Sequence, residues 1–104
     1  MIYAEFFRKN GNFCGFEVKG HAGLAESGSD IACASVSSAV QMSANTITDI
    51  FKFKAEVSVG ENTVLLKTAV CDEILQKLYD SLLMQLELLS QEFNGTINIE
   101  FTEV

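Results

Sequence analysis

The order of extended and helical patterns along the chain predicts an α+β fold, ββαββαβ, in which a largely antiparallel sheet packs against two helices. Three observations support this prediction: two pairs of strand-like runs joined by short turns, two long segments with helical spacing, and one alternating segment near the end. With 104 residues, 48% of them hydrophobic, the chain is long enough to bury one core. We therefore expect a single domain over residues 1–104.

The first strand pair is indicated by its turn. Residues 2–8 and 13–19 are rich in aromatic and β-branched residues, and Asn10-Gly11 between them is a strong hairpin signal. The following segment, residues 21–29, has two glycines, two serines and no apolar periodicity, which is typical of a loop.

A long helix is predicted from Asp30, which we expect to be its N-cap, to about Phe51. This segment contains no Gly or Pro, and five of its apolar residues recur at helical spacing: Val36, Val40, Ala44, Ile47 and Phe51.

The second half of the chain repeats the strand, strand, helix order. Residues 53–59 alternate apolar and polar and should pair with residues 63–68 across a short turn. Asp72 can cap a second helix that runs to about Phe93, and residues 96–102 alternate again as a final strand. The apolar stripe of the second helix comprises Leu75, Leu78, Leu82, Leu86, Leu89 and Phe93.

Charge and cysteine content restrict the function and the compartment. A formal net charge of −7, from 14 acidic and 7 basic side chains, argues against a nucleic acid coat protein and favours a basic partner. No apolar run approaches the roughly 20 residues of a membrane helix. The amino terminus lacks a secretory pattern, and three cysteines cannot form a complete disulfide framework, so we expect a cytoplasmic protein.

Cys33 and His21 are the candidate catalytic pair. Cys33 is predicted in the first turn of the long helix, where unpaired N–H groups and the helix dipole favour a thiolate. Its base must be an imidazole, and His21 is the single histidine. The N–H groups of residues 31–34 would then face a developing oxyanion. Spacing alone does not show that sulfur and imidazole meet.

Other candidate residues have weaker support. Asp30 is either an orienting group for the imidazole or only a helix cap, and Ser37, one turn after Cys33, can line the site. Cys14 and Cys71 are expected to be structural. A metal site built from the three cysteines and the histidine is disfavoured because no Cys-x-x-Cys or close Cys-His pair is present, so we expect no metal and no cofactor.

The segments Gly20-His21-Ala22, Gly28-Ser29-Asp30-Ile31-Ala32-Cys33-Ala34 and Ser37 resemble the signature of the bacterial ribosomal-processing cysteine protease family, Prp. The resemblance extends over nearly the whole chain and is most specific in this core. It implies that His21 and Cys33 are catalytic, that residues 22–29 are the glycine-rich loop, and that supporting or substrate-binding roles fall on four residues: Gly20, Gly28, Asp30 and Ser37.

The resemblance also implies a substrate and a setting. It implies a cytoplasmic endopeptidase, typically a homodimer, that cuts after paired aromatic residues. Its expected substrate is the short N-terminal extension of ribosomal protein twenty-seven of the large subunit, removed before or during ribosome assembly. No direct contact with nucleic acid or membrane is expected.

Two other functions stay open from the residues themselves. A non-catalytic acidic module that binds a ribosomal protein or assembly factor would share the fold and the charge, but its Cys33 would be an ordinary buried thiol. A thiol redox protein is less favoured because Cys33 has no evident resolving cysteine.

Overall fold

The elements of the protein follow the predicted order. The computed structural model describes residues 1–20 and 27–104, and the side chains of residues 27–30 lie outside the described set. The elements are β1 (Ile2–Lys9), β2 (Asn12–Lys19), α1 (Ser27–Asn45), the π-helical segment η1 (Thr46–Ile50), β3 (Ala55–Gly60), β4 (Thr63–Thr68), α2 (Glu73–Glu92) and β5 (Ile97–Glu103). The predicted ββαββαβ fold is confirmed.

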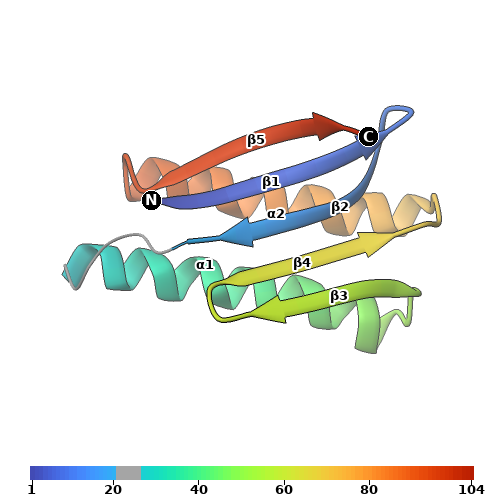
Figure 1. The fold of residues 1–104 in the computed structure, drawn as a ribbon, viewed down its shortest axis with the longest axis horizontal. Coiled ribbons are helices and arrows are strands. Elements are labelled where there is room, and N and C mark those ends of the chain that lie inside the picture. The colour runs from blue at the N-terminus through green and yellow to red at the C-terminus, as the bar shows by residue number, and fades with distance from the viewer. Residues whose placement is uncertain (21–26) are drawn as a thin grey trace.

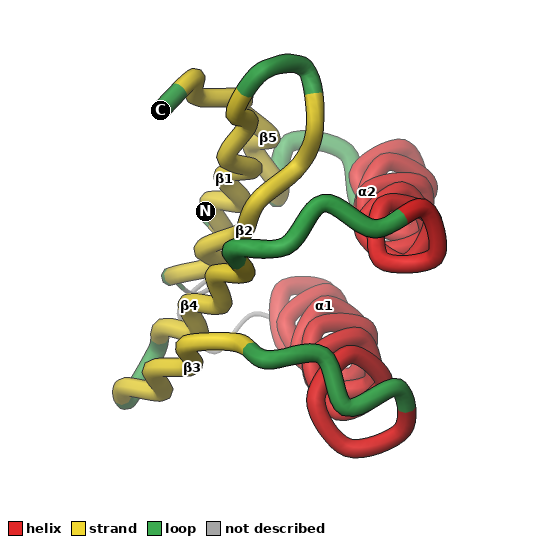
Figure 2. The backbone as a smooth tube through the Cα atoms, turned by 90° about the vertical axis from the view of Figure 1, so that its right-hand side faces the viewer, coloured by secondary structure: helices red, strands yellow, loops and turns green. Residues whose placement is uncertain are grey.

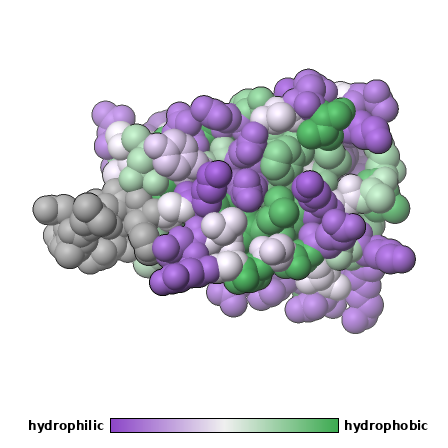
Figure 3. Space-filling view, viewed as in Figure 1, coloured by the Kyte–Doolittle hydropathy of each residue, from purple (hydrophilic) through white to green (hydrophobic). Residues whose placement is uncertain are grey.

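The five strands form one sheet in the order β3-β4-β2-β1-β5. All neighbouring strands are antiparallel except β1 and β5, which run parallel. Both helices cover the same face of this sheet, as Figures 1 and 2 show. Figure 3 shows the opposite face, where hydrophilic and hydrophobic side chains are interspersed. The arrangement therefore has two layers, with the core between sheet and helices.

The β1–β2 hairpin forms as its turn sequence predicts. Asn10 and Gly11 both have positive φ, 54° and 82°, the conformation that a two-residue hairpin turn requires. The ladder shifts register so that Phe7 pairs with Gly15 but Arg8 pairs with Phe13, which leaves Cys14 as the extra residue of a bulge.

A side chain of α2 binds the backbone at this bulge. The Phe13 N–H donates to Gln76 Oε1 at 2.7 Å, and Gln76 Nε2 donates to the Phe13 carbonyl at 2.8 Å. The amide of Gln76 therefore pairs with Phe13 as a neighbouring strand would, and it fixes α2 against β2.

The α2 helix begins and packs as predicted. The carboxylate of Asp72 accepts hydrogen bonds from the N–H groups of Ile74 and Leu75, at 2.8 and 3.1 Å, so it is the N-cap. Tyr79, which the sequence stripe omitted, is also fully buried and shares a 2.6 Å hydrogen bond with the Thr68 hydroxyl. Burial raises the pKa of Tyr79 to about 12.

The first helix differs from the prediction at both ends. It starts at Ser27, so Asp30 is its fourth residue and is not its N-cap, and the last residues of the predicted loop are helical. At the other end, α1 gives way to η1, in which the Phe51 N–H bonds the Thr46 carbonyl five residues back. The predicted end near Phe51 is confirmed, but the last turn is wider than an α-helix.

Candidate active site

Cys33 lies one turn further into α1 than predicted. It is the seventh residue of the helix and is partly buried against the hydrophobic core. Since the helix starts at Ser27, the N–H groups of residues 31–34 bond carbonyls of residues 27–30 within the helix, and the expectation that they face an oxyanion is wrong.

The position of Cys33 also places it beyond the first turn of the described helix. The field of a helix dipole acts mainly within the first turn and is weaker one turn further in.

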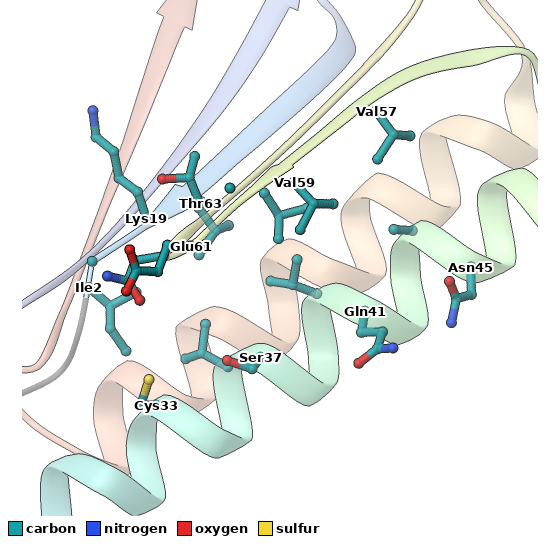
Figure 4. A pocket seen from close by; sticks show the side chains of 18 of the residues that line it. Ile2, Lys19, Cys33, Ser37, Gln41, Asn45, Val57, Val59, Glu61 and Thr63 are labelled. Atoms are coloured by element: carbon teal, nitrogen blue, oxygen red, sulfur yellow. The ribbon is translucent and has the colours of Figure 1, made fainter.

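A groove of about 600 Å³ runs beside α1, with Cys33 near one end. Figure 4 shows its two walls, α1 on one side and the β3–β4 hairpin on the other. Val57 and Val59 pair with Leu66 and Val64, and Leu66 is fully buried on the helix-covered face of the sheet. Directly paired residues share a face, yet Val57 and Val59 are 44% and 72% exposed. The helix therefore leaves these valines open to the groove.

Gly20 reaches the same groove from the end of β2. Its φ is +97°, and a Cβ there would lie 2.6 Å from the Met1 carbonyl oxygen, so residue 20 must be glycine. Its N–H donates to the Asn62 carbonyl at 3.0 Å, which ties the end of β2 to the β3–β4 turn. This geometry fixes the point from which the chain continues to residue 21.

Of the six predicted site residues, the structure brings Gly20, Cys33 and Ser37 to one groove. Gly28 and Asp30 belong to the first turn of α1. His21 lies outside the described residues, as does most of the predicted glycine-rich loop, so its distance from Cys33 stays a prediction.

Several groove residues were not predicted from the sequence. Gln41 and Asn45 line the groove on the same side of α1 as Ser37, and their four-residue spacing is a signal that could have indicated them. Val57, Val59 and Asn62 approach the site only through the fold, because they are distant in sequence from Cys33.

The other cysteines lie away from the groove lining. Cys14 is the bulge residue of β2, and Cys71 is exposed before α2. No disulfide joins the three cysteines, all of which are described. Among residues 1–20 and 27–104, no group of three or more His, Cys, Asp or Glu side chains is placed to hold a metal ion. None of the described helices is long and apolar enough to cross a membrane.

A two-layer α+β domain with a cysteine at one end of a peptide-sized groove fits a cysteine-dependent peptidase. The family model "Cysteine protease Prp" matches residues 1–98, and this chain belongs to that family. It is accordingly a cysteine peptidase. A comparison with curated proteins gives no match.

Solved structures agree with this assignment in their fold. The ribosomal processing protease Prp from S. aureus with a substrate peptide is 20% identical, with a TM-score of 0.88 over 98% of this chain and 100% of that chain. The same protein with a covalently linked product peptide is 21% identical, with a TM-score of 0.87 over the same shares. SMU.848 from Streptococcus mutans is 23% identical, with a TM-score of 0.80 over 100% of this chain and 96% of that chain.

Proposed function

We propose that this chain is a cytoplasmic endopeptidase, one protease domain over residues 1–104, that removes the N-terminal extension of ribosomal protein twenty-seven of the large subunit. Cys33 is its nucleophile and His21 its general base. One observation carries the proposal: Gly20 and Cys33 line the same groove, and His21 directly follows Gly20 in the chain. The family assignment and the peptides bound to the S. aureus relative support a peptide substrate.

The proposed reaction is acyl transfer through a thioester. His21 takes the thiol proton of Cys33, and the sulfur attacks the scissile carbonyl to form a C–S bond and an oxyanion. The C–N bond breaks as His21 gives that proton to the leaving amine. Water then attacks the thioester, its proton returns through His21 to the sulfur, and the extension leaves as a carboxylic acid. N–H groups of the first residues of α1, from Ser27 onward, are the candidate donors to the oxyanion.

The supporting residues have distinct proposed roles. Gly20 sets the path of the chain before His21, and Ser37 lines the groove one turn after Cys33. Gly28 and Asp30 lie in the first turn of α1, which we propose faces the substrate carbonyl. We also infer from the family that the enzyme is a homodimer. Sedimentation equilibrium in the analytical ultracentrifuge, which gives the mass in solution, tests this inference.

The central experiment is cleavage of a synthetic peptide that spans the extension and its junction, with products identified by mass. Cys33→Ala and His21→Ala should each lower kcat by roughly a thousandfold or more. Cys71→Ala is the matched control, because Cys71 is an exposed thiol that does not line the groove. Undiminished cleavage by Cys33→Ala would rule out the proposed nucleophile.

A second readout separates the peptidase from a binding module. In mildly acidic buffer, an activated Cys33 should react with iodoacetamide faster than the exposed Cys71, although Cys33 is the less accessible of the two. The same labelling in His21→Ala should be slower at Cys33 and unchanged at Cys71. Equal reactivity of the two cysteines in the wild type would favour the binding module.

A further inference from the structure

Three polar side chains of α1 form a line along the groove. Ser37, Gln41 and Asn45 are exposed, are spaced four residues apart, and follow one another along the helix beside the groove (Figure 4). Four helical residues rise about 6 Å, so these polar groups recur at that interval. We call these three residues the polar ladder.

The polar ladder has no hydrogen-bonding task within the described part of the chain. The next hydroxyls, of Thr46 and Thr48, donate back to the helix carbonyls of Met42 and Ala44 at 2.7 and 2.9 Å. Within residues 1–20 and 27–104, the side chains of the ladder make no hydrogen bond of this kind or any other. Their polar groups are available to a ligand in the groove.

The opposite wall has the matching repeat. Val57 and Val59 face the groove from alternate positions of β3, which lie about 6.6 Å apart. An extended peptide has the same two-residue repeat, and each alternate residue presents both its N–H and its carbonyl to the same side. A strand lying in the groove would therefore meet a polar group on α1 and an apolar group on β3 once every two residues.

The molecule already contains the interaction that this arrangement would use. Gln76 binds the N–H and the carbonyl of one extended residue, Phe13, through its side-chain amide. Gln41 and Asn45 carry the same functional group, with one donor and one acceptor end.

We propose that Gln41 and Asn45 are substrate-positioning residues that bind the backbone of alternate residues of an extended peptide, independently of its sequence. Val57 and Val59, with Ala44 of α1, contact the side chains of that peptide. The inference rests on the proposed function for the location of the cut at Cys33. From Cys33 to Asn45 the helix rises about 18 Å, which spans roughly five to six extended residues.

Charge determines which side of the scissile bond lies along the ladder. Lys19 and Glu61 are the charged residues among the described groove lining, and the part of the groove from Val40 to Thr48 has none. A basic ribosomal segment would need acidic partners there. The occupant is therefore an uncharged segment, and we assign it to the amino-terminal side of the cut, where the family resemblance implies paired aromatic residues.

The test measures binding of a fluorescent junction peptide by anisotropy, in a Cys33→Ala background in which no cleavage occurs. Gln41→Ala and Asn45→Ala should each raise the Kd for this peptide roughly five- to tenfold. Because the contact is to backbone, the factor should be the same for peptides with different side chains. Shortening the peptide to fewer than about five residues before the scissile bond should weaken binding by a similar or larger factor.

Met42→Ala is the matched control. Met42 is adjacent to Gln41 but lines a separate shallow hollow on the outer side of α1, which the ladder residues also border. Its variant should bind the peptide as well as the parent chain does. Weaker binding by Met42→Ala than by Gln41→Ala would place the peptide in the outer hollow and overturn the inference.

Peptide N-methylation gives a readout that a merely structural role of Gln41 would not change. Methylating one backbone nitrogen at a time removes one N–H donor, and sensitivity should alternate along the peptide. In Gln41→Ala, one of the sensitive positions should become tolerant. Three results would each refute the positioning role of Gln41 and Asn45: equal sensitivity to methylation at every peptide position, an unchanged Kd in both ladder variants, or no binding of the peptide at all.

A wild-type chain that binds the peptide but does not cleave it would instead refute the proposed function.

Discussion

Gly20 and Met1 approach each other so closely that residue 20 has no space for a side chain. A Cβ on Gly20 would lie 2.6 Å from the Met1 carbonyl oxygen, and the φ of +97° is one that other residues rarely adopt. Because the contact is with backbone, only movement of β1 or of the end of β2 would relieve it. The relationship fixes the exit of β2 immediately before His21.

Gly20→Ala should therefore reduce both stability and activity. We expect the free energy of unfolding to fall by about 2 kcal/mol, from backbone strain and the clash with Met1. Displacing the residue before His21 should lower kcat/KM roughly ten- to a hundredfold. Urea denaturation and peptide cleavage measure the two effects.

Gly11→Ala is the control that separates backbone strain at a positive φ from displacement of the chain before His21. Gly11 also has a positive φ, +82°, but a Cβ there would meet nothing within 4 Å, and the residue lies in the β1–β2 turn. This variant should lose about 1 kcal/mol and keep its activity. Wild-type activity in Gly20→Ala would show that the path before His21 is not constrained.

Gln76→Ala tests the contact between α2 and the bulge in β2. The substitution removes two hydrogen bonds and leaves the Phe13 N–H and carbonyl without this partner. We expect a loss of about 2 kcal/mol in the free energy of unfolding, measured by urea denaturation. Gln85→Ala, an exposed position on the same helix, should change it by less than about 0.5 kcal/mol. Equal effects of the two substitutions would contradict the proposed contact.

Tyr79→Phe should change the pH dependence of stability. Burial raises the pKa of Tyr79 from 10.0 to about 12, so the folded state keeps the phenol proton to higher pH than the unfolded state. Its contribution to stability is fully present below pH 10 and is lost as the pH rises towards 12.

Below pH 10, Tyr79→Phe should be about 1 kcal/mol less stable, since the Thr68 hydroxyl loses its buried partner. Between pH 10 and 12 this difference should shrink, because only the wild type has a Tyr79 to ionise on unfolding. Urea denaturation at a series of pH values measures both. Curves that stay parallel over this range would show that Tyr79 titrates normally.

Asp72→Ala tests the N-cap of α2. The two N–H groups of Ile74 and Leu75 lose their acceptor, and the unfolding free energy should fall by about 1 kcal/mol. Asp80→Ala removes the same charge from an exposed position within α2 and is the control. A thermal melt of each variant shows whether the cap or the charge matters.

The sequence determined those features that depend on neighbouring residues. The Asn10-Gly11 turn, the Asp72 cap and the apolar stripe of α2 are all present as predicted, because each depends on backbone conformation or spacing within a few residues. The motif around Cys33 indicated a cysteine peptidase for the same reason, since its residues are close in the chain.

The tertiary structure decided where α1 starts and what faces it. Asp30 is a good capping residue by type, but the helix begins three residues earlier, so Cys33 lies in the second turn of the helix and not in the first. The parallel pairing of β5 with β1 and the binding of Gln76 to Phe13 join segments far apart in sequence, which no local pattern specifies.

The candidate catalytic pair shows both contributions. The sequence predicts Cys33 as the nucleophile and His21, the single histidine, as its base, because that prediction rests on residue chemistry alone. Only the fold brings Gly20 to the groove that Cys33 lines and places Val57 and Val59 across this groove from α1. The physical reason is that the groove lies between a helix and a hairpin, and its shape comes from their packing.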